Sequence, residues 1–127
     1  MPFVRLDLPE TISAERALRA GDAVHQALVE TMAVPADDRF QAITRHPPGA
    51  LVCTPEYLGV RHSADALFIE VACAPGRTLQ QKRAFYARTA ADVSVACDVS
   101  PSDVLIHLVE TLRENWSFGD GIAHYTL

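Results

Sequence analysis

The stretch Met1-Pro2-Phe3-Val4-Arg5-Leu6-Asp7-Leu8 decides the fold. Its residues alternate with a period of two, which predicts a strand with one apolar side and one mixed side. Phe3, Arg5 and Asp7 lie on the mixed side. The apolar side consists of Pro2, Val4, Leu6 and Leu8. Proline is tolerated at the first residue of a strand, so this strand can begin at the start of the chain.

Pro2 could take part in a reaction if it becomes the first residue. Initiator methionine is normally removed when a small residue such as proline follows, so we expect Pro2 to carry a free secondary amine at a strand end. Burial against apolar groups lowers the pKa of such an amine, and a neighbouring carboxylate raises it. In either state the amine can act as an acid, a base or a nucleophile. Most chains that begin Met-Pro make no such use of it, so the remaining sequence must decide.

Composition favours one globular domain that binds small anions. The 127 residues are expected to form a single domain, 1–127, with a sizeable core, since 49 % of them are hydrophobic. The net charge of −5 argues against nucleic-acid binding, which needs a basic face. All basic residues except Lys82 are arginines, whose planar fork suits carboxylates.

Cysteine and histidine spacing predicts neither a disulfide framework nor a metal site. Cys53, Cys73 and Cys97 are odd in number and show no CxxC spacing. Reduced thiols indicate a cytoplasmic protein, and neither a signal peptide nor a membrane span is predicted. The five histidines are interpreted as structural or exposed. They are His25, His46, His62, His107 and His124.

The first half of the chain predicts a strand, a helix and a second strand. Ser13 is a candidate helix cap, and the helix should end by Val34 because Pro35 disfavours helical geometry before it. Its inward positions, at helical spacing, are Ala17, Gly21, Val24, Leu28 and Met32. Residues 39–44 predict the next strand, and residues 51–53 a short one within a long excursion.

The second half repeats that order. Residues 66–74 are almost continuously apolar, as expected of a central strand in a parallel pair. A helix over 79–97 follows, and then a strand over 104–109. The inward positions predicted for this helix are Ala84, Ala87, Ala91 and Val95.

The two halves match when shifted by 66 residues. The shift superposes Pro9 on Pro75, Pro35 on Pro101 and Asp37 on Asp103. We therefore predict an α+β fold with two β-α-β pseudo-repeats, about 2–60 and 64–127, each with a parallel strand pair and a right-handed crossover. The four strands form one sheet with both helices on one face. The other face then needs cover, which predicts a homo-oligomer.

Four local stretches are distinctive. They are Pro2-Phe3-Val4-Arg5-Leu6-Asp7-Leu8, Ala23-Val24-His25-Gln26-Ala27-Leu28-Val29, Val34-Pro35-Ala36-Asp37-Asp38-Arg39-Phe40-Gln41 and Trp116-Ser117-Phe118-Gly119. With an amino-terminal proline and a duplicated β-α-β order, the chain resembles the tautomerase superfamily and, within it, the malonate semialdehyde decarboxylase branch. This likeness extends over nearly the whole chain. It implies a trimer acting on a small oxo acid without metal or organic cofactor.

The resemblance also assigns roles to residues. It implies that Pro2 and Asp38 are catalytic, and that Arg77 binds the substrate carboxylate. One form of the family enzyme carries an Arg-x-Arg pair after its third strand, where this chain has Ala74 and Gly76. A second form is closer to the present Pro75-Gly76-Arg77-Thr78.

Two aromatic residues of the tail complete the implied site. Trp116 and Phe118 would form a dry wall of the substrate pocket, although core or interface packing suits them equally well. Arg39 and Arg61 are secondary candidates for anion contacts, and Asp37 is interpreted as a surface turn residue. Without the family match, Asp38 would be assigned to closing its turn.

The implied chemistry is decarboxylation. Loss of carbon dioxide from malonate semialdehyde leaves an enolate, which a protonated Pro2 amine would stabilise by hydrogen bonding. An uncharged Pro2 could instead abstract a proton beside a carbonyl, which would make the protein a tautomerase or hydratase of 2-oxo acids. A third interpretation is a noncatalytic trimeric binding protein with this fold.

Overall fold

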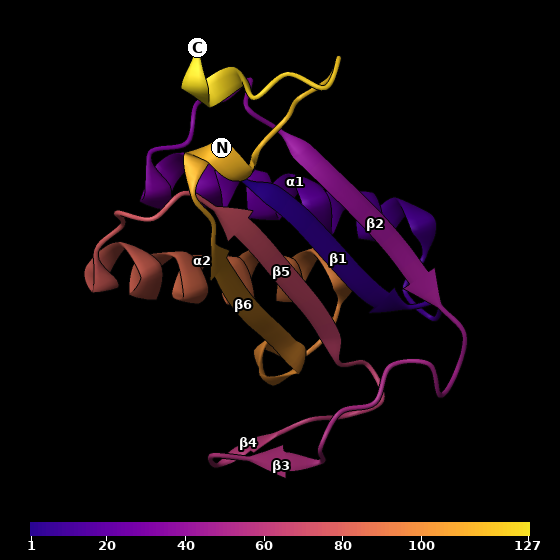
Figure 1. Cartoon of the computed structure of the whole chain (residues 1–127). Helices are drawn as coiled ribbons and strands as arrows, with labels where there is room; N and C mark the ends of the chain where they lie inside the picture. Colours follow the sequence, from indigo (N-terminus) through magenta and orange to yellow (C-terminus); the bar gives the residue numbers. More distant parts are fainter.

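The computed structural model describes residues 1–127 as a four-stranded sheet with two helices packed on one face (Figure 1). The strands of the sheet are β1 (Phe3–Pro9), β2 (Phe40–His46), β5 (Leu67–Cys73) and β6 (Val104–Glu110). The helices are α1 (Ala14–Met32) and α2 (Leu79–Cys97). A small hairpin, β3 (Glu56–Tyr57) and β4 (Val60–Arg61), projects from the body. Three 3-10 turns cover Pro101–Asp103, Arg113–Asn115 and His124–Thr126.

The strand order β2-β1-β5-β6 confirms two joined β-α-β units. β1 pairs with β2 in parallel, and β5 pairs with β6 in parallel. The two units meet through the antiparallel pairing of β1 with β5, where Phe3 is opposite Ala72. Consequently the beginnings of β1 and β2 lie at the same end of the sheet as the ends of β5 and β6.

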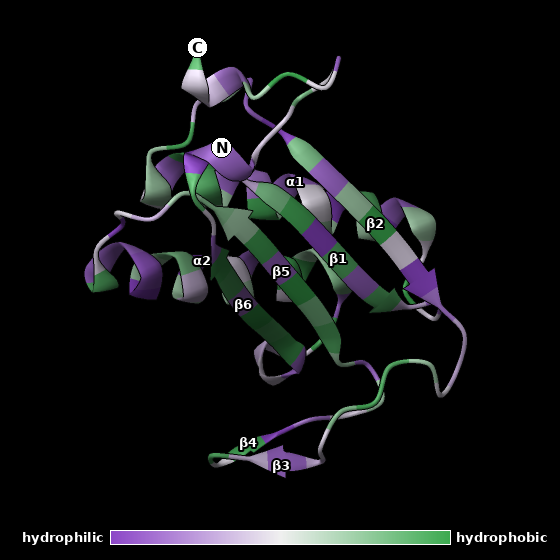
Figure 2. Cartoon of the chain, in the orientation of Figure 1, coloured by the Kyte–Doolittle hydropathy of each residue, from purple (hydrophilic) through white to green (hydrophobic).

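The core lies between the sheet and the helices. Val4, Leu6 and Leu8 are fully buried on the predicted apolar side of β1. On the same face of the sheet, β5 buries Leu67, Ile69, Val71 and Cys73. Figure 2 shows β5 and β6 as hydrophobic along nearly their whole lengths. These strands and helix faces account for most of the buried apolar surface, which is the main stabilising contribution to such a fold.

Helix α1 forms as the sequence predicts. Ser13 caps it by accepting from the Arg16 N–H at 3.1 Å, and the predicted inward positions are all buried. Gly21 lies so close to β2 that an added Cβ would stand 2.7 Å from Gln41 Oε1. The Gln41 amide in turn donates to the Gly21 carbonyl at 2.8 Å. Glycine at this position therefore sets the spacing between α1 and β2.

The inward face predicted for α2 was wrong. Ala84, Ala87 and Ala91 are exposed, and Val95 is 81 % exposed. The buried side chains of α2 are Phe85, Thr89, Val93, Ser94 and Cys97. Alanines occur all around this helix and define no apolar face. The large Phe85 gains far more from burial than any alanine does, so it decides the rotation of the helix.

The short strand predicted at residues 51–53 was also wrong. Val52 is 85 % exposed, and no strand pairs with this segment. The excursion instead contains the β3–β4 hairpin, in which Tyr57 is opposite Val60. Leu58 and Gly59 between them both have positive φ, as a tight two-residue hairpin turn requires.

The second face of the sheet carries no helix. Side chains paired across neighbouring strands lie on this face. One row consists of Arg5, Glu70 and His107, and the next row includes Phe68 and Leu105. This face thus combines charged and apolar side chains. No helix of the chain is both long enough and apolar enough to cross a membrane.

We predict that Phe85→Ala lowers the free energy of unfolding by about 3–5 kcal/mol, because it opens a cavity in the core. The matched control, Val95→Ala on the exposed side of the same helix, should change it by less than about 0.5 kcal/mol. Urea unfolding followed by circular dichroism measures both. A larger loss for the Val95 variant would contradict the observed rotation of α2.

Candidate active site

A cavity of about 430 Å³ opens at the sheet end where β1 begins and β5 ends. Five segments contribute to it: the chain start, the end of α1, the loop after β5, the first turn of α2 and the tail after β6. Its lining residues are Met1, Met32, Ala33, Ala74, Pro75, Gly76, Arg77, Gln81, Arg113 and Tyr125. The sheet topology therefore gathers residues that are far apart in sequence into one site.

Asp38 faces the start of the chain. The Met1 ammonium nitrogen lies 3.7 Å from Asp38 Oδ2, and the two side chains are only 15 % and 14 % exposed. The second oxygen, Asp38 Oδ1, is buried and accepts no hydrogen bond. A buried carboxylate oxygen without a donor is costly, and such groups often mark functional sites. Asp38 can therefore accept an additional N–H or O–H from a group at this position.

The turn that carries Asp38 is fastened to α1. The Asp38 N–H donates to the Pro35 carbonyl at 3.0 Å, closing the turn. His25 Nε2 donates to the Ala36 carbonyl at 2.8 Å, and Arg39 pairs with Asp22 at 2.7 Å. These contacts fix the turn relative to the helix and leave Asp38 Oδ2 facing the chain start.

Arg77 is held in the cavity wall by main-chain carbonyls. Its Nε donates to the Met32 carbonyl at 3.3 Å and its Nη1 to the Ala74 carbonyl at 3.1 Å. A guanidinium has five N–H donors, so several remain for a ligand. Arg77 has no acidic partner among the ion pairs of the chain. Gly76, with φ of +121°, provides the backbone conformation that a residue with a side chain rarely adopts here.

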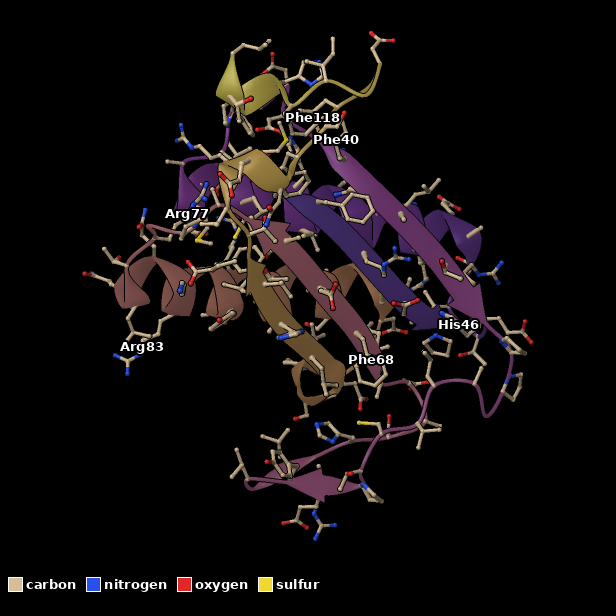
Figure 3. The ribbon with its side chains drawn as sticks, in the orientation of Figure 1. Phe40, His46, Phe68, Arg77, Arg83 and Phe118 are labelled. Carbon is tan, nitrogen blue, oxygen red and sulfur yellow. The ribbon has the colours of Figure 1, made fainter.

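Trp116 and Phe118 lie beside the cavity and do not line it. Their rings stack at 5.6 Å, and Phe118 also contacts Phe40 at 5.7 Å. With Phe3 they form a second hollow of about 330 Å³. Figure 3 shows Phe40 and Phe118 together at the start of β2, with Arg77 at the same end of the sheet but apart from them. The structure thus brings Asp38 and Arg77 to the chain start, and the two tail aromatics to an adjacent hollow.

Tyr125 connects the two hollows and was not foreseen from the sequence. Its ring meets Phe118 edge-on at 5.4 Å, and the Arg113 guanidinium lies 5.7 Å from its centroid. Burial raises the pKa of the Tyr125 phenol and the charge of Asp38 adds to this, whereas Arg113 acts in the opposite direction. The phenol therefore remains a proton donor at neutral pH.

Gln81 and Arg113 were likewise missed as cavity residues. Gln81 belongs to the capping box of α2, in which its side chain accepts from the Thr78 N–H at 2.9 Å. This S/T-x-x-Q pattern was a readable signal for the position of Gln81. Arg113 and Tyr125 follow the last strand in a segment without periodicity, and the sequence offers no comparable signal for them.

The other candidates lie outside the cavity. Arg39 pairs with Asp22 beside α1, and Arg61 pairs with Glu56 in the hairpin. Asp37 is exposed in its turn. Each of the five histidines has a partner within the protein, and none lines this cavity.

Comparison with known proteins agrees with this architecture. A family model described as "Tautomerase enzyme" matches residues 38–119, and another with the same description matches residues 2–61. The "Probable tautomerase YusQ" of Bacillus subtilis (strain 168) is 32 % identical over 97 % of this chain and 97 % of its own. "Probable tautomerase YrdN" of the same organism is 28 % identical over 98 % of this chain and 96 % of its own.

Solved structures extend the comparison. FG41 malonate semialdehyde decarboxylase inhibited by 3-bromopropiolate superposes with a TM-score of 0.89 at 37 % identity, covering 98 % of this chain and 94 % of the other. Another malonate semialdehyde decarboxylase gives a TM-score of 0.87 at 33 % identity, covering 98 % and 95 %. Fold and sequence together define an enzyme of the tautomerase type. The chain belongs to the tautomerase superfamily, in its malonate semialdehyde decarboxylase-like branch.

We predict that Phe118→Ala loosens the tail, because Phe118 touches Trp116, Phe40 and Tyr125 at once. Hydrogen exchange should become faster at the amides of Ile122 and Thr126, whose hydrogen bonds lie within the tail. The control Leu127→Ala removes an exposed apolar side chain and should leave these rates unchanged. Unaltered exchange in the Phe118 variant would contradict this role.

Proposed function

We propose that the protein is a cofactor-independent decarboxylase that converts malonate semialdehyde to acetaldehyde and carbon dioxide. The observation that carries this proposal is that the chain start and Arg77 line one cavity, while the Asp38 carboxylate lies beside the chain start, 3.7 Å from the terminal nitrogen. The similarity to two malonate semialdehyde decarboxylases over 98 % of the chain supports it.

The proposed reaction uses three groups. Arg77 binds the substrate carboxylate through N–H donors that its two carbonyl contacts leave available. The bond between this carboxylate carbon and the methylene carbon breaks, and the electron pair moves onto the carbonyl oxygen as an enolate. A protonated Pro2 amine donates a hydrogen bond to that oxygen, an interaction typically worth about 3–4 kcal/mol in a preorganised site. Protonation of the carbon then gives acetaldehyde.

Pro2 can act in this way only after Met1 is removed. While Met1 is attached, the Pro2 nitrogen is an amide without a basic lone pair. Met1 lines the cavity, and Pro2 behind it is buried at the start of the sheet. Removal of Met1 would transfer the positive charge to the Pro2 amine near Asp38, whose Oδ1 needs a donor. An α-amine has a pKa of about 8 in the absence of neighbours, and a carboxylate favours its charged form.

We predict that intact mass spectrometry of the purified protein finds it shorter by one methionine, and that Pro2→Ala abolishes decarboxylation of malonate semialdehyde. Asp38→Asn should reduce kcat by about 10²-fold or more, since it removes the charge that orients the amine. Arg77→Ala should mainly raise KM. Acetaldehyde release, coupled to a dehydrogenase, measures all three, and Arg83→Ala on the outer side of α2 is the control. Full activity of every variant would rule out the proposed site.

A tautomerase or hydratase of small 2-oxo acids is the second candidate. It is favoured by the names of the Bacillus relatives, and one of the two similar malonate semialdehyde decarboxylases has both decarboxylase and hydratase activities. Ketonisation of phenylenolpyruvate separates this activity from acetaldehyde release. A noncatalytic trimeric binding protein would be indicated if Pro2→Ala left every assayed turnover unchanged.

We also propose that the protein forms a homo-oligomer, and specifically a trimer, in the cytoplasm. The helix-free face of the sheet presents Phe68 and Leu105, and the projecting hairpin exposes Tyr57 and Leu58. A surface of this kind is typical of an interface between subunits. Three free cysteines, two of them buried, are in keeping with a reducing compartment.

We predict that light scattering coupled to gel filtration gives three times the mass of one chain. Leu105→Asp on the helix-free face should shift the protein towards monomer, because it would bury an unpaired charge between subunits. Val95→Asp on the exposed side of α2 is the matched control and should leave the mass unchanged. A wild-type mass of one chain would contradict the trimer.

A further inference from the structure

We propose that Arg113 gives the cavity a second carboxylate site, so that the enzyme prefers small 3-oxo acids that carry two carboxylates. This inference deepens the proposed decarboxylase function and rests on it. The preferred substrate class is malonate semialdehyde with its aldehyde hydrogen replaced by a carboxylate, a four-carbon 3-oxo dicarboxylate.

The charge of the cavity is the first observation. Arg77 and Arg113 both line it, and none of its lining residues is acidic. The chain as a whole has a net charge of −5, so this cationic pocket is opposite in sign to the rest of the protein. The nearby carboxylate, Asp38, already faces the terminal ammonium at 3.7 Å. The two guanidiniums are thus available to an anionic ligand.

The second observation is that neither guanidinium is neutralised by the protein. The arginines that form ion pairs lie elsewhere, such as Arg39 with Asp22 and Arg88 with Glu30. Arg113 has no carboxylate partner; its guanidinium lies over the Tyr125 ring, 5.7 Å from the centroid. Stacking on an aromatic ring positions a guanidinium while leaving its N–H edge free for a carboxylate.

The two arginines come from different segments of the chain, so each can bind a different carboxylate. Arg77 is fixed in the loop after β5 by the Met32 and Ala74 carbonyls, whereas Arg113 begins the 3-10 turn after β6. One carboxylate is satisfied by one guanidinium fork. A substrate with a single carboxylate would leave the other fork unused, and a volume of about 430 Å³ has room for a second charged group.

The extra carboxylate is compatible with the proposed reaction. Arg77 binds the carboxylate that leaves, and Arg113 binds the carboxylate attached to the carbonyl carbon. The bond between the methylene carbon and the departing carboxylate breaks, and its electron pair moves onto the carbonyl oxygen. Protonation of the methylene carbon then gives a 2-oxo acid and carbon dioxide, with no oxidant or reductant required.

Binding of unreactive acids tests the site independently of turnover. Calorimetry would compare succinate, with two carboxylates, against butanoate, with one, for the mature wild type, Arg113→Gln and the control Arg83→Gln. We expect wild type to bind succinate more tightly than butanoate. Arg113→Gln should reduce that preference about tenfold, because it removes one charged hydrogen-bonding contact. Arg83→Gln, an exposed arginine on α2, should keep the preference. Equal affinity of wild type for the two acids would overturn the proposal.

Kinetics tests the substrate class. We compare kcat/KM for oxaloacetate with kcat/KM for malonate semialdehyde, after subtracting the spontaneous decarboxylation measured in chelator-containing buffer. The ratio of the first value to the second should exceed one in wild type. It should fall about tenfold in Arg113→Gln. A ratio unaffected by Arg113→Gln would overturn the role of Arg113. If neither acid is decarboxylated but the succinate preference depends on Arg113, the proposed function fails and the second carboxylate site stands.

Discussion

The antiparallel pairing of β1 with β5 is the constraint on which the site depends. Within each β-α-β unit the strands are parallel, so both strands begin at one end of the sheet and both finish at the other end. Joining the units antiparallel brings the first residues of the chain beside the end of β5, with Phe3 opposite Ala72. The loop carrying Arg77 and the tail carrying Arg113 both leave the sheet at that end. A cavity lined by the chain start and two guanidiniums, with the Asp38 carboxylate beside the chain start, follows from this single pairing.

Rigid support distinguishes the groups of this site. The Asp38 turn is tied to α1 through His25 and through the pair of Arg39 with Asp22. Arg77 is tied to the carbonyls at the ends of α1 and β5. Tyr125 depends on packing against Phe118 in a tail without strand or α-helix. Arg77 and the neighbouring Asp38 turn are therefore held by hydrogen bonds and an ion pair, whereas the Tyr125 side of the cavity is held by aromatic contacts. Charges fixed in this way would suit the proposed catalysis.

Much of the fold could be predicted because the spacing of apolar residues is regular in the first strand and the first helix. The alternation in β1 and the helical spacing around Val24 each bury one well-defined face, and the structure follows both. Helix α2 was harder, since alanines on every side leave its rotation to Phe85. Asp38 and Arg77 were singled out only through the resemblance to the tautomerase superfamily, since local chemistry alone would assign Asp38 to closing its turn. Arg113 and Tyr125 approach the cavity through long-range packing of an aperiodic tail, which no local pattern encodes.

Gly21 influences the position of residues beyond those that it contacts. Its missing side chain lets α1 approach β2 until Gln41 closes the gap with a hydrogen bond to the helix backbone. Gln41 lies in β2, three residues after Asp38, which belongs to the turn that leads into this strand. The smallest residue of the helix thus helps to set the position of the Asp38 carboxylate, which it does not contact. Activity in this scaffold can be tuned by interior spacing as well as by the groups that meet the ligand.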